Sequence, residues 1–177
     1  MGRSLLIGAL VLSTLGLCLP FALTQPHPGQ GQRPFPASTP TASSHRRIVL
    51  PLERSPRFGA LLVRVQVNGK PAVLIVDTGS NTTILSPEIC GLNADRLPRA
   101  EPPPKGTGFV GEGRWGQATL TIGTAVWKDR RVLIVDTTDL TEATQRKIDG
   151  ILGQDILDDF KYVEINLEAK RITLGSN

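Results

Sequence analysis

A β-hairpin signature in residues 61–76 constrains the fold of this chain more than any other feature. Residues 61–67 read LLVRVQV, in which apolar and polar residues alternate with the two-residue period of a half-buried strand. Asn68-Gly69 follows and is a typical tight hairpin turn. Residues 72–76 read AVLIV, a continuous apolar run suited to a buried strand. The two segments predict an antiparallel pair in a β-sheet protein.

Short strand patterns recur through the rest of residues 47–177. The sequence has 18 Gly and 14 Pro, which favour turns between short elements over long helices. We predict an all-β, barrel-like domain over residues 47–177 with one short helix, at residues 154–160. Further strands are predicted at residues 48–50, 82–85, 117–122, 132–135, 162–166 and 171–174, the last two joined by a hairpin turn.

The first 46 residues have a different character. Residues 4–23 form an uncharged run of 20 residues preceded by Arg3, which is long enough to span a membrane and also has the basic start and apolar stretch of a secretory signal. Residues 1–23 are therefore predicted to be a signal peptide or a single-pass membrane anchor. The poor cleavage site, with no Ala-x-Ala motif, favours the anchor. Residues 24–46 are rich in Pro, Gln and Ser and are predicted to be a disordered linker.

The distribution of charge bears on location and partners. With Arg3 held inside, the folded domain is expected on the non-cytoplasmic side of a membrane, or exported if the leader is cleaved. Residues 1–47 contain four Arg and no acidic residue, which leaves 16 basic and 16 acidic residues in the other 130. The net charge of +4 thus belongs to the N-terminal arm. Since the folded domain is neutral, nucleic acid is not predicted as a partner.

Histidine and cysteine are too scarce for several kinds of catalysis. The only histidines are His27 and His45, and the only cysteines are Cys18 and Cys90. From residue 48 onward the chain has no histidine and a single cysteine. This excludes Ser/His/Asp catalysis, Cys/His catalysis and histidine-based metal sites in the folded domain, so no metal or cofactor is predicted. Cys90 is interpreted as a small buried apolar residue. The alternative, in an oxidising compartment, is a disulfide between two chains.

Asp77 is the leading candidate for chemistry. It ends the apolar run of residues 72–76 and is followed by Thr78, Gly79 and Ser80. The strand would hold the carboxylate rigidly, and Gly79 would permit a sharp turn close to it. The triplet alone is a common turn, so its context decides the interpretation.

A short internal sequence repeat accompanies this motif. Residues 73–78 read VLIVDT, and residues 132–137 read VLIVDT again, but Thr138 stands where the first copy has glycine. We interpret the copies as two similar buried strands related by pseudo-symmetry within one lobe. If the chain were active as a monomer, Asp136 would be the first candidate for a second carboxylate.

Together these motifs resemble those of the retropepsin-like aspartic proteases, the single-lobe relatives of pepsin. The resemblance covers most of residues 48–177 and includes a second signature, two hydrophobic residues and a glycine before a short helix. It implies that Asp77 is the catalytic aspartate, that the Thr78 hydroxyl braces the paired loops, that Gly79 holds the turn and that Ser80 hydrogen-bonds the outer oxygen of the carboxylate. The second signature is Ile151-Leu152-Gly153, and the flap candidates, between Gly106 and Trp115, are Gly108, Gly111 and Gly113.

The resemblance also implies a homodimer. Two carboxylates that share a proton are needed to activate water and protonate the peptide carbonyl, and this chain has a single Asp-Thr-Gly. A second copy would therefore supply the other Asp77 at a two-fold interface, and the substrate would be a peptide or protein. The predicted function is an aspartic endopeptidase. The alternative is a catalytically silent module of the same fold, used for binding or dimerisation.

Two positions depart from the family pattern. The flap tyrosine of pepsin-like members is missing, since the only tyrosine is Tyr162. Trp115 is either its substitute or a packed strand residue, and we favour the packed residue. A charged residue often follows the glycine of the second signature, whereas this chain has Gln154 and lacks that charge.

Overall fold

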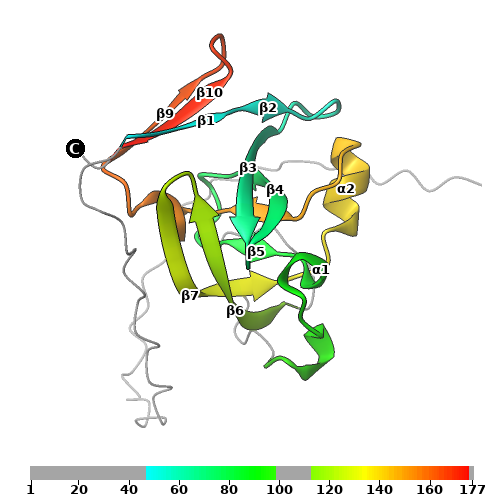
Figure 1. The fold of residues 1–177 in the computed structure, drawn as a ribbon. Helices are drawn as coiled ribbons and strands as arrows, with labels where there is room; N and C mark the ends of the chain where they lie inside the picture. Colours follow the sequence, from blue (N-terminus) through cyan, green and yellow to red (C-terminus); the bar gives the residue numbers. More distant parts are fainter. Residues whose placement is uncertain (1–46, 99–112, 176–177) are drawn as a thin grey trace, which may run out of the picture. The chain divides into compact units, whose positions relative to one another are not determined.

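The computed structural model describes residues 47–98 and 113–175. Within these ranges six strands close into a barrel (Figure 1), which confirms the predicted all-β, barrel-like class. In order around the barrel they are β3 (Leu61–Val67), β4 (Lys70–Val76), β8 (Gly150–Leu152), β5 (Ile84–Leu85), β7 (Ala125–Ile134) and β6 (Arg114–Ile122), and β6 pairs with β3 to close the ring.

The predicted hairpin is present as β3 and β4. The first strand has the predicted bounds, and the second begins two residues earlier than predicted, at Lys70. Asn68 and Gly69 have φ of +50° and +78°, as a type I′ turn requires at its two central positions. Asn68 also helps to close the barrel, because its N–H donates to the Thr119 carbonyl (2.8 Å) and its Oδ1 accepts from the Thr119 N–H (2.8 Å).

The two copies of the VLIVDT repeat form equivalent strands, β4 and β7. β8 lies between β4 and β5, parallel to β4 and antiparallel to β5, and β5 is parallel to β7. In the spatial order β4-β8-β5-β7, the two outer strands carry the repeated sequence and run in opposite directions. The topology thus confirms the interpretation of two related strands, and it places the residues after β4 and after β7 at opposite ends of the barrel.

A separate three-stranded sheet joins the two ends of the domain. It contains β1 (Ile48–Pro51), β10 (Arg171–Gly175) and β9 (Tyr162–Asn166), paired antiparallel in that order. The β9–β10 hairpin agrees with the predicted closing hairpin. A short strand, β2 (Glu53–Arg54), follows β1 and pairs with β3. These pairings tie residues near 50 to residues near 170.

Alternation along the barrel strands creates two apolar clusters. The larger one fills the barrel around Trp127, which is fully buried and donates from Nε1 to Asp159 Oδ2 at 2.7 Å. The second cluster lies on the other face of the central strands, because neighbouring residues such as Ile84 and Leu85 point to opposite sides. Its buried members are Ile84, Leu133, Val135 and Ile151, with Ile75, Trp115 and Leu140 packed against them.

The described residues contain three short α-helices, which correspond to the helix start expected at residues 87–92, the helical turn expected at residues 141–147 and the short helix predicted at residues 154–160. They are α1 (Pro87–Cys90), α2 (Thr138–Thr144) and α3 (Gln154–Leu157), and a 3₁₀ turn covers Ala94–Arg96. The first is defined by its caps, since the Ser86 hydroxyl accepts from the Ile89 N–H (3.3 Å). Helices of four to seven residues are too short to show the periodicity by which helices are recognised.

β7 is also longer than predicted. It begins at Ala125 rather than at residue 132, and its middle contains the charged residues 128–131. Three of these, Lys128, Asp129 and Arg131, are exposed. They interrupt the apolar pattern between the buried Trp127 and the buried run that begins at Val132. The Asp129 backbone, at φ +51°, interrupts the regular strand geometry there.

The predictions for the N-terminal arm lie outside the described residues. This applies to the anchor or signal at residues 1–23 and to the linker at residues 24–46. Within residues 47–98 and 113–175, no helix is long and apolar enough to cross a membrane.

Candidate active site

Asp77 occupies the first position after β4, and its loop holds the carboxylate in place. The backbone N–H of Asp77 donates to the Leu152 carbonyl (3.1 Å), which continues the parallel β4–β8 ladder. The Gly79 N–H donates to Asp77 Oδ1 at 2.8 Å. A Cβ on residue 79 would lie only 3.2 Å from that oxygen, so glycine lets the backbone approach the carboxylate this closely.

The Asp77 loop is partly exposed to solvent in the single chain. Asp77 is half-buried, whereas Thr78 and Gly79 are exposed. The bracing role predicted for Thr78 requires a threonine that is accessible to a second molecule. The exposed Thr78, beside the hydrogen-bonded Asp77 carboxylate, meets that requirement.

Ser80 does not have the hydroxyl contact that the resemblance implied. Its side chain is fully buried, and its Oγ donates to the Thr82 carbonyl at 2.8 Å. Because a hydroxyl carries one proton, that proton is not available to the Asp77 carboxylate. Ser80 instead stabilises the return of the loop toward β5.

The second signature lies directly against the Asp77 loop. Ile151 and Leu152 pair with the last two residues of β4. A Cβ on Gly153 would lie 2.6 Å from the Thr82 carbonyl carbon and 2.9 Å from the Ser80 carbonyl oxygen. Only glycine allows β8 to pass this close to the loop. Gly150, which the sequence analysis did not single out, has a similar role, because a Cβ there would collide with the Ile84 carbonyl oxygen.

The first turn of α3 contacts the same loop through two side chains that the sequence analysis missed. Gln154 Nε2 donates to the Thr78 carbonyl at 2.6 Å. Asp155 Oδ1 accepts from Thr83 Oγ1 at 2.7 Å, and Thr83 Oγ1 in turn accepts from the Gly153 N–H at 3.2 Å. The only sequence signal for these contacts was the position of two polar residues immediately after the second signature.

Burial raises the pKa of the Asp155 carboxyl above its ordinary value. The hydrogen bond from Thr83 and the positive charge of Arg130 oppose this shift. Arg130 Nε lies 4.0 Å from Asp155 Oδ2, and the Arg130 guanidinium also donates to the Asp155 carbonyl.

Asp136 has a local geometry like that of Asp77 but a different location. Its Oδ1 accepts from the Thr138 N–H (2.9 Å) and from the Thr138 hydroxyl (2.7 Å). The hydroxyl bond, followed by the backbone bond, lowers the pKa of this exposed carboxyl. Because β7 runs antiparallel to β4 in the barrel, Asp136 lies at the end away from Asp77. Asp136 as the second carboxylate of a monomeric site is therefore wrong.

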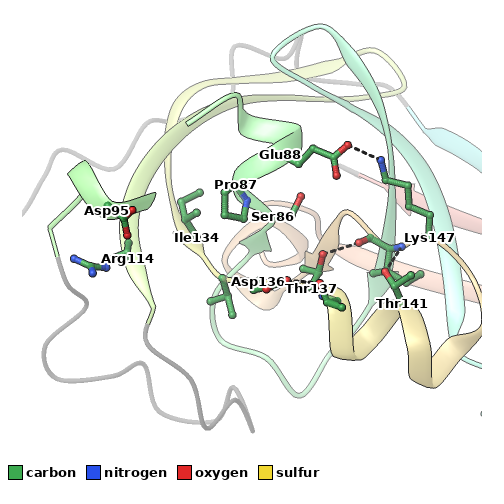
Figure 2. A pocket seen from close by; sticks show the side chains of 13 residues that line it. Ser86, Pro87, Glu88, Asp95, Arg114, Ile134, Asp136, Thr137, Thr141 and Lys147 are labelled. Atoms are coloured by element: carbon green, nitrogen blue, oxygen red, sulfur yellow. Dashed lines mark hydrogen bonds and ion pairs between the residues drawn. The ribbon is translucent and has the colours of Figure 1, made fainter. Parts of the chain in front are cut away.

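An open pocket of about 800 Å³ lies beside Asp136 (Figure 2). Figure 2 shows Lys147 reaching Glu88, with 3.0 Å between Nζ and Oε1, and the Thr137 hydroxyl donating to the Ile148 carbonyl at 2.8 Å. The Asp77 loop does not line this pocket. This pocket is thus separate from the candidate catalytic group.

Of the flap candidates, Gly108 and Gly111 lie outside the described residues, and Gly113 immediately precedes β6. A Cβ on Gly113 would lie 2.7 Å from Leu133 Cδ1, so this glycine packs on the second apolar cluster. Trp115 is half-buried against the same cluster, and the Arg131 guanidinium lies 3.8 Å from its ring centroid. The interpretation of Trp115 as a packed strand residue is confirmed.

Two further observations concern cysteine and metals. Cys90 is buried and not part of a disulfide, and burial raises its pKa to about 11, which agrees with the predicted small apolar role. Among the described residues, no group of three or more His, Cys, Asp or Glu side chains could hold a metal ion.

Comparison with known proteins identifies similar chains. Residues 63–156 match a family model described as aspartyl protease. A retropepsin-like aspartic protease from Rickettsia conorii has a similar structure, with a TM-score of 0.51 and 16% identity over 73% of this chain and 90% of that one. A comparison with curated protein sequences found no match.

Two more distant structures were also found. They are the retroviral protease-like domain of Ddi1 from Leishmania major (TM-score 0.40, 18% identity, 65% of this chain and 87% of that one) and the EIAV protease in complex with the inhibitor HBY-793 (TM-score 0.37, 22% identity, 60% and 88%).

Proposed function

Because this chain belongs to the aspartyl protease family and has a retropepsin-like fold, we propose that it is an aspartic endopeptidase with Asp77 as its catalytic carboxylate. The observation that carries the proposal is the position of Asp77. It follows a buried strand, its carboxylate accepts a 2.8 Å hydrogen bond from the Gly79 N–H, and its loop is packed on the second signature.

Peptide hydrolysis by this chemistry needs a second carboxylate, which we assign to Asp77 of another copy. Two aspartates placed close together share one proton, because both cannot ionise without strong repulsion. The ionised one takes a proton from water as the water attacks the peptide carbonyl, and the protonated one donates to the carbonyl oxygen. The resulting tetrahedral diol collapses when the leaving amine is protonated.

Three features of the single chain support a two-fold dimer. Thr78 and Gly79 are exposed beside Asp77. Among the described strands, β1 and β9 each pair on one side only, with β10, and open strand edges are ready to pair with another chain. Phe58 is 77% exposed on the loop before β3, at the end of the barrel where Asp77 lies. We propose that a second copy covers these groups.

A cleavage assay with two matched substitutions tests the function. Purified wild type, Asp77→Asn and Asp136→Asn would be incubated with a mixed peptide library at several pH values, and the cuts mapped by mass spectrometry. Both changes keep the side-chain oxygen that accepts the local backbone N–H, so both variants should fold. We expect Asp77→Asn to abolish cleavage and Asp136→Asn to retain it. Cleavage by Asp77→Asn, or a well-folded wild type that cuts no peptide, would contradict the proposal, and the second result would favour a silent binding module.

A further inference from the structure

The peptide group between Thr78 and Gly79 is hydrogen-bonded on both sides. Its carbonyl oxygen accepts from Gln154 Nε2 at 2.6 Å, and its N–H donates to Asp77 Oδ1 at 2.8 Å. The C=O and N–H of a trans peptide point in opposite directions from a rigid plane. The Gln154 amide and the Asp77 carboxylate therefore lie on opposite sides of one rigid group, and the position of one affects the other.

We propose that Gln154 is a positioning residue of the active site, which acts on Asp77 through the Thr78–Gly79 peptide. This inference rests on the proposed function, since it takes Asp77 as the catalytic carboxylate. Gln154 fixes the rotation of the peptide plane and so aims the Gly79 N–H at Oδ1. Hydrogen bonds in series also polarise one another, so donation to the carbonyl strengthens the N–H on the other side. A stronger N–H donor favours the ionised form of the carboxylate that it contacts.

Gln154 is itself held firmly enough to do this. It is the first residue of α3, its backbone N–H donates to the Ser80 carbonyl at 2.7 Å, and its carbonyl accepts from the Asp158 N–H at 2.8 Å. The Gln154 backbone therefore moves with the loop, and its side chain bridges only a short gap to Thr78. The neutral Gln154 amide contacts the Asp77 loop of the same chain and supplies no charge. We therefore expect its hold on the loop to be insensitive to salt, unlike an ion pair.

Three substitutions at residue 154 separate the donor from the shape. Gln154→Glu keeps the length but turns an oxygen toward the Thr78 carbonyl, Gln154→Met removes the polar group, and Gln154→Lys supplies a donor again. Gln117→Glu is the matched control for charge, because Gln117 is exposed on β6. For each full-length variant, kcat and KM would be measured across the pH range, together with the thermal midpoint.

We expect kcat to fall roughly tenfold in Gln154→Glu and Gln154→Met, as for the loss of one useful hydrogen bond, with KM little changed. The acid side of the activity profile should move to higher pH in both variants, because the ionised carboxylate loses support. Gln154→Lys should recover most of the rate, and Gln117→Glu should behave as wild type. A merely structural role would lower the thermal midpoint without moving the pH profile, and that result would overturn the proposal.

A second readout does not depend on peptide cleavage, so failure of this inference can be told from failure of the proposed function. The amide proton of Gly79 can be followed by NMR while the pH is lowered. In the wild type its chemical shift should titrate as the Asp77 carboxylate is protonated, and in Gln154→Glu the size of that change should be reduced. An equal change in both proteins would refute the link through the peptide, whether or not either protein cuts a peptide.

Discussion

Thr83 and Asp155 are 72 positions apart in the sequence, yet Thr83 Oγ1 donates a 2.7 Å hydrogen bond to Asp155 Oδ1. The bond connects the chain just before β5 to the first turn of α3. The same hydroxyl accepts from the Gly153 N–H, so one threonine ties the second signature, the helix and the Asp77 loop together. This contact gives the loop a second point of attachment besides Gln154.

The buried carboxyl of Asp155 should make stability depend on pH. Its pKa is raised in the folded state, mainly by desolvation, so the folded protein binds this proton more tightly than the unfolded chain. The stabilisation is complete below the ordinary Asp value of 3.8 and is lost as pH rises through the raised value. Asp155→Asn keeps an oxygen acceptor for Thr83 but does not titrate. As pH rises from the ordinary Asp value through the raised pKa, we expect the free energy of unfolding of Asp155→Asn to increase relative to that of wild type, by roughly 1.4 kcal/mol per unit of pKa shift.

Thermal unfolding of both proteins between pH 3 and pH 8 would measure this difference. The gap between their free energies of unfolding should grow with pH just above pH 4 and then level off. A constant gap over the whole range would show that Asp155 titrates at its ordinary value in the folded protein.

Gly153→Ala should damage both stability and activity. The new Cβ would lie 2.6 Å from the Thr82 carbonyl carbon, a backbone atom that cannot move without shifting the loop. We expect a loss of about 1–3 kcal/mol, as for overpacking, with a large fall in peptide cleavage.

Gly69→Ala provides the comparison for Gly153→Ala. Residue 69 has a positive φ, but no atom lies within 4 Å of a Cβ built there, so the cost should be about 1 kcal/mol of backbone strain without loss of activity. Calorimetry and the cleavage assay would measure both variants. Equal activity in the two would contradict the close packing described for the second signature.

Activity per chain should rise with protein concentration. The proposed site needs two copies of Asp77, so dilution should separate them and abolish cleavage. Phe58→Ser should weaken association, because it removes an exposed aromatic side chain at the Asp77 end of the barrel. Sedimentation velocity alongside an activity titration tests both points. A monomer that retains full activity would refute the dimer.

The N-terminal segment should keep the protein on a membrane. Residues 4–23 are uncharged, 20 residues long and without a clear cleavage motif. We expect the full-length chain to fractionate with membranes and to keep its original N-terminus. A soluble exported product that starts near residues 23–25 would show a cleaved signal instead, without bearing on the protease proposal.

Sequence patterns predicted the features that depend on local chemistry. The β3–β4 hairpin follows from alternation and from Asn68-Gly69, whose backbone preference is intrinsic to those residues. The sequence repeat also predicted that the two VLIVDT copies form two related strands, and the structure places them on β4 and β7, the outer strands of the order β4-β8-β5-β7. The family resemblance of the Asp77 motif and the second signature agrees with the matched range of residues 63–156.

Contacts between distant polar residues could not be predicted in this way. Gln154 and Thr78 are 76 positions apart and have no complementary charge, so only the threading of β8 beside β4 reveals their bond. The position of Asp136 likewise depends on strand direction, which identical local sequences do not encode. Ser80 was misassigned because a hydroxyl has several possible acceptors nearby, and packing decides which one it contacts.

The unequal burial of the two tryptophans gives the protein a built-in pair of optical probes. The chain contains only Trp115 and Trp127; the latter is fully enclosed and hydrogen-bonded to Asp159, whereas the former is half-buried beneath the Arg131 guanidinium. Emission from Trp127 should be shielded from soluble quenchers until the barrel opens, while Trp115 should respond to events at the second apolar cluster in the intact protein. Replacing either ring by Phe would leave a single emitter, so that global unfolding and local ligand contact could be followed separately without an attached dye.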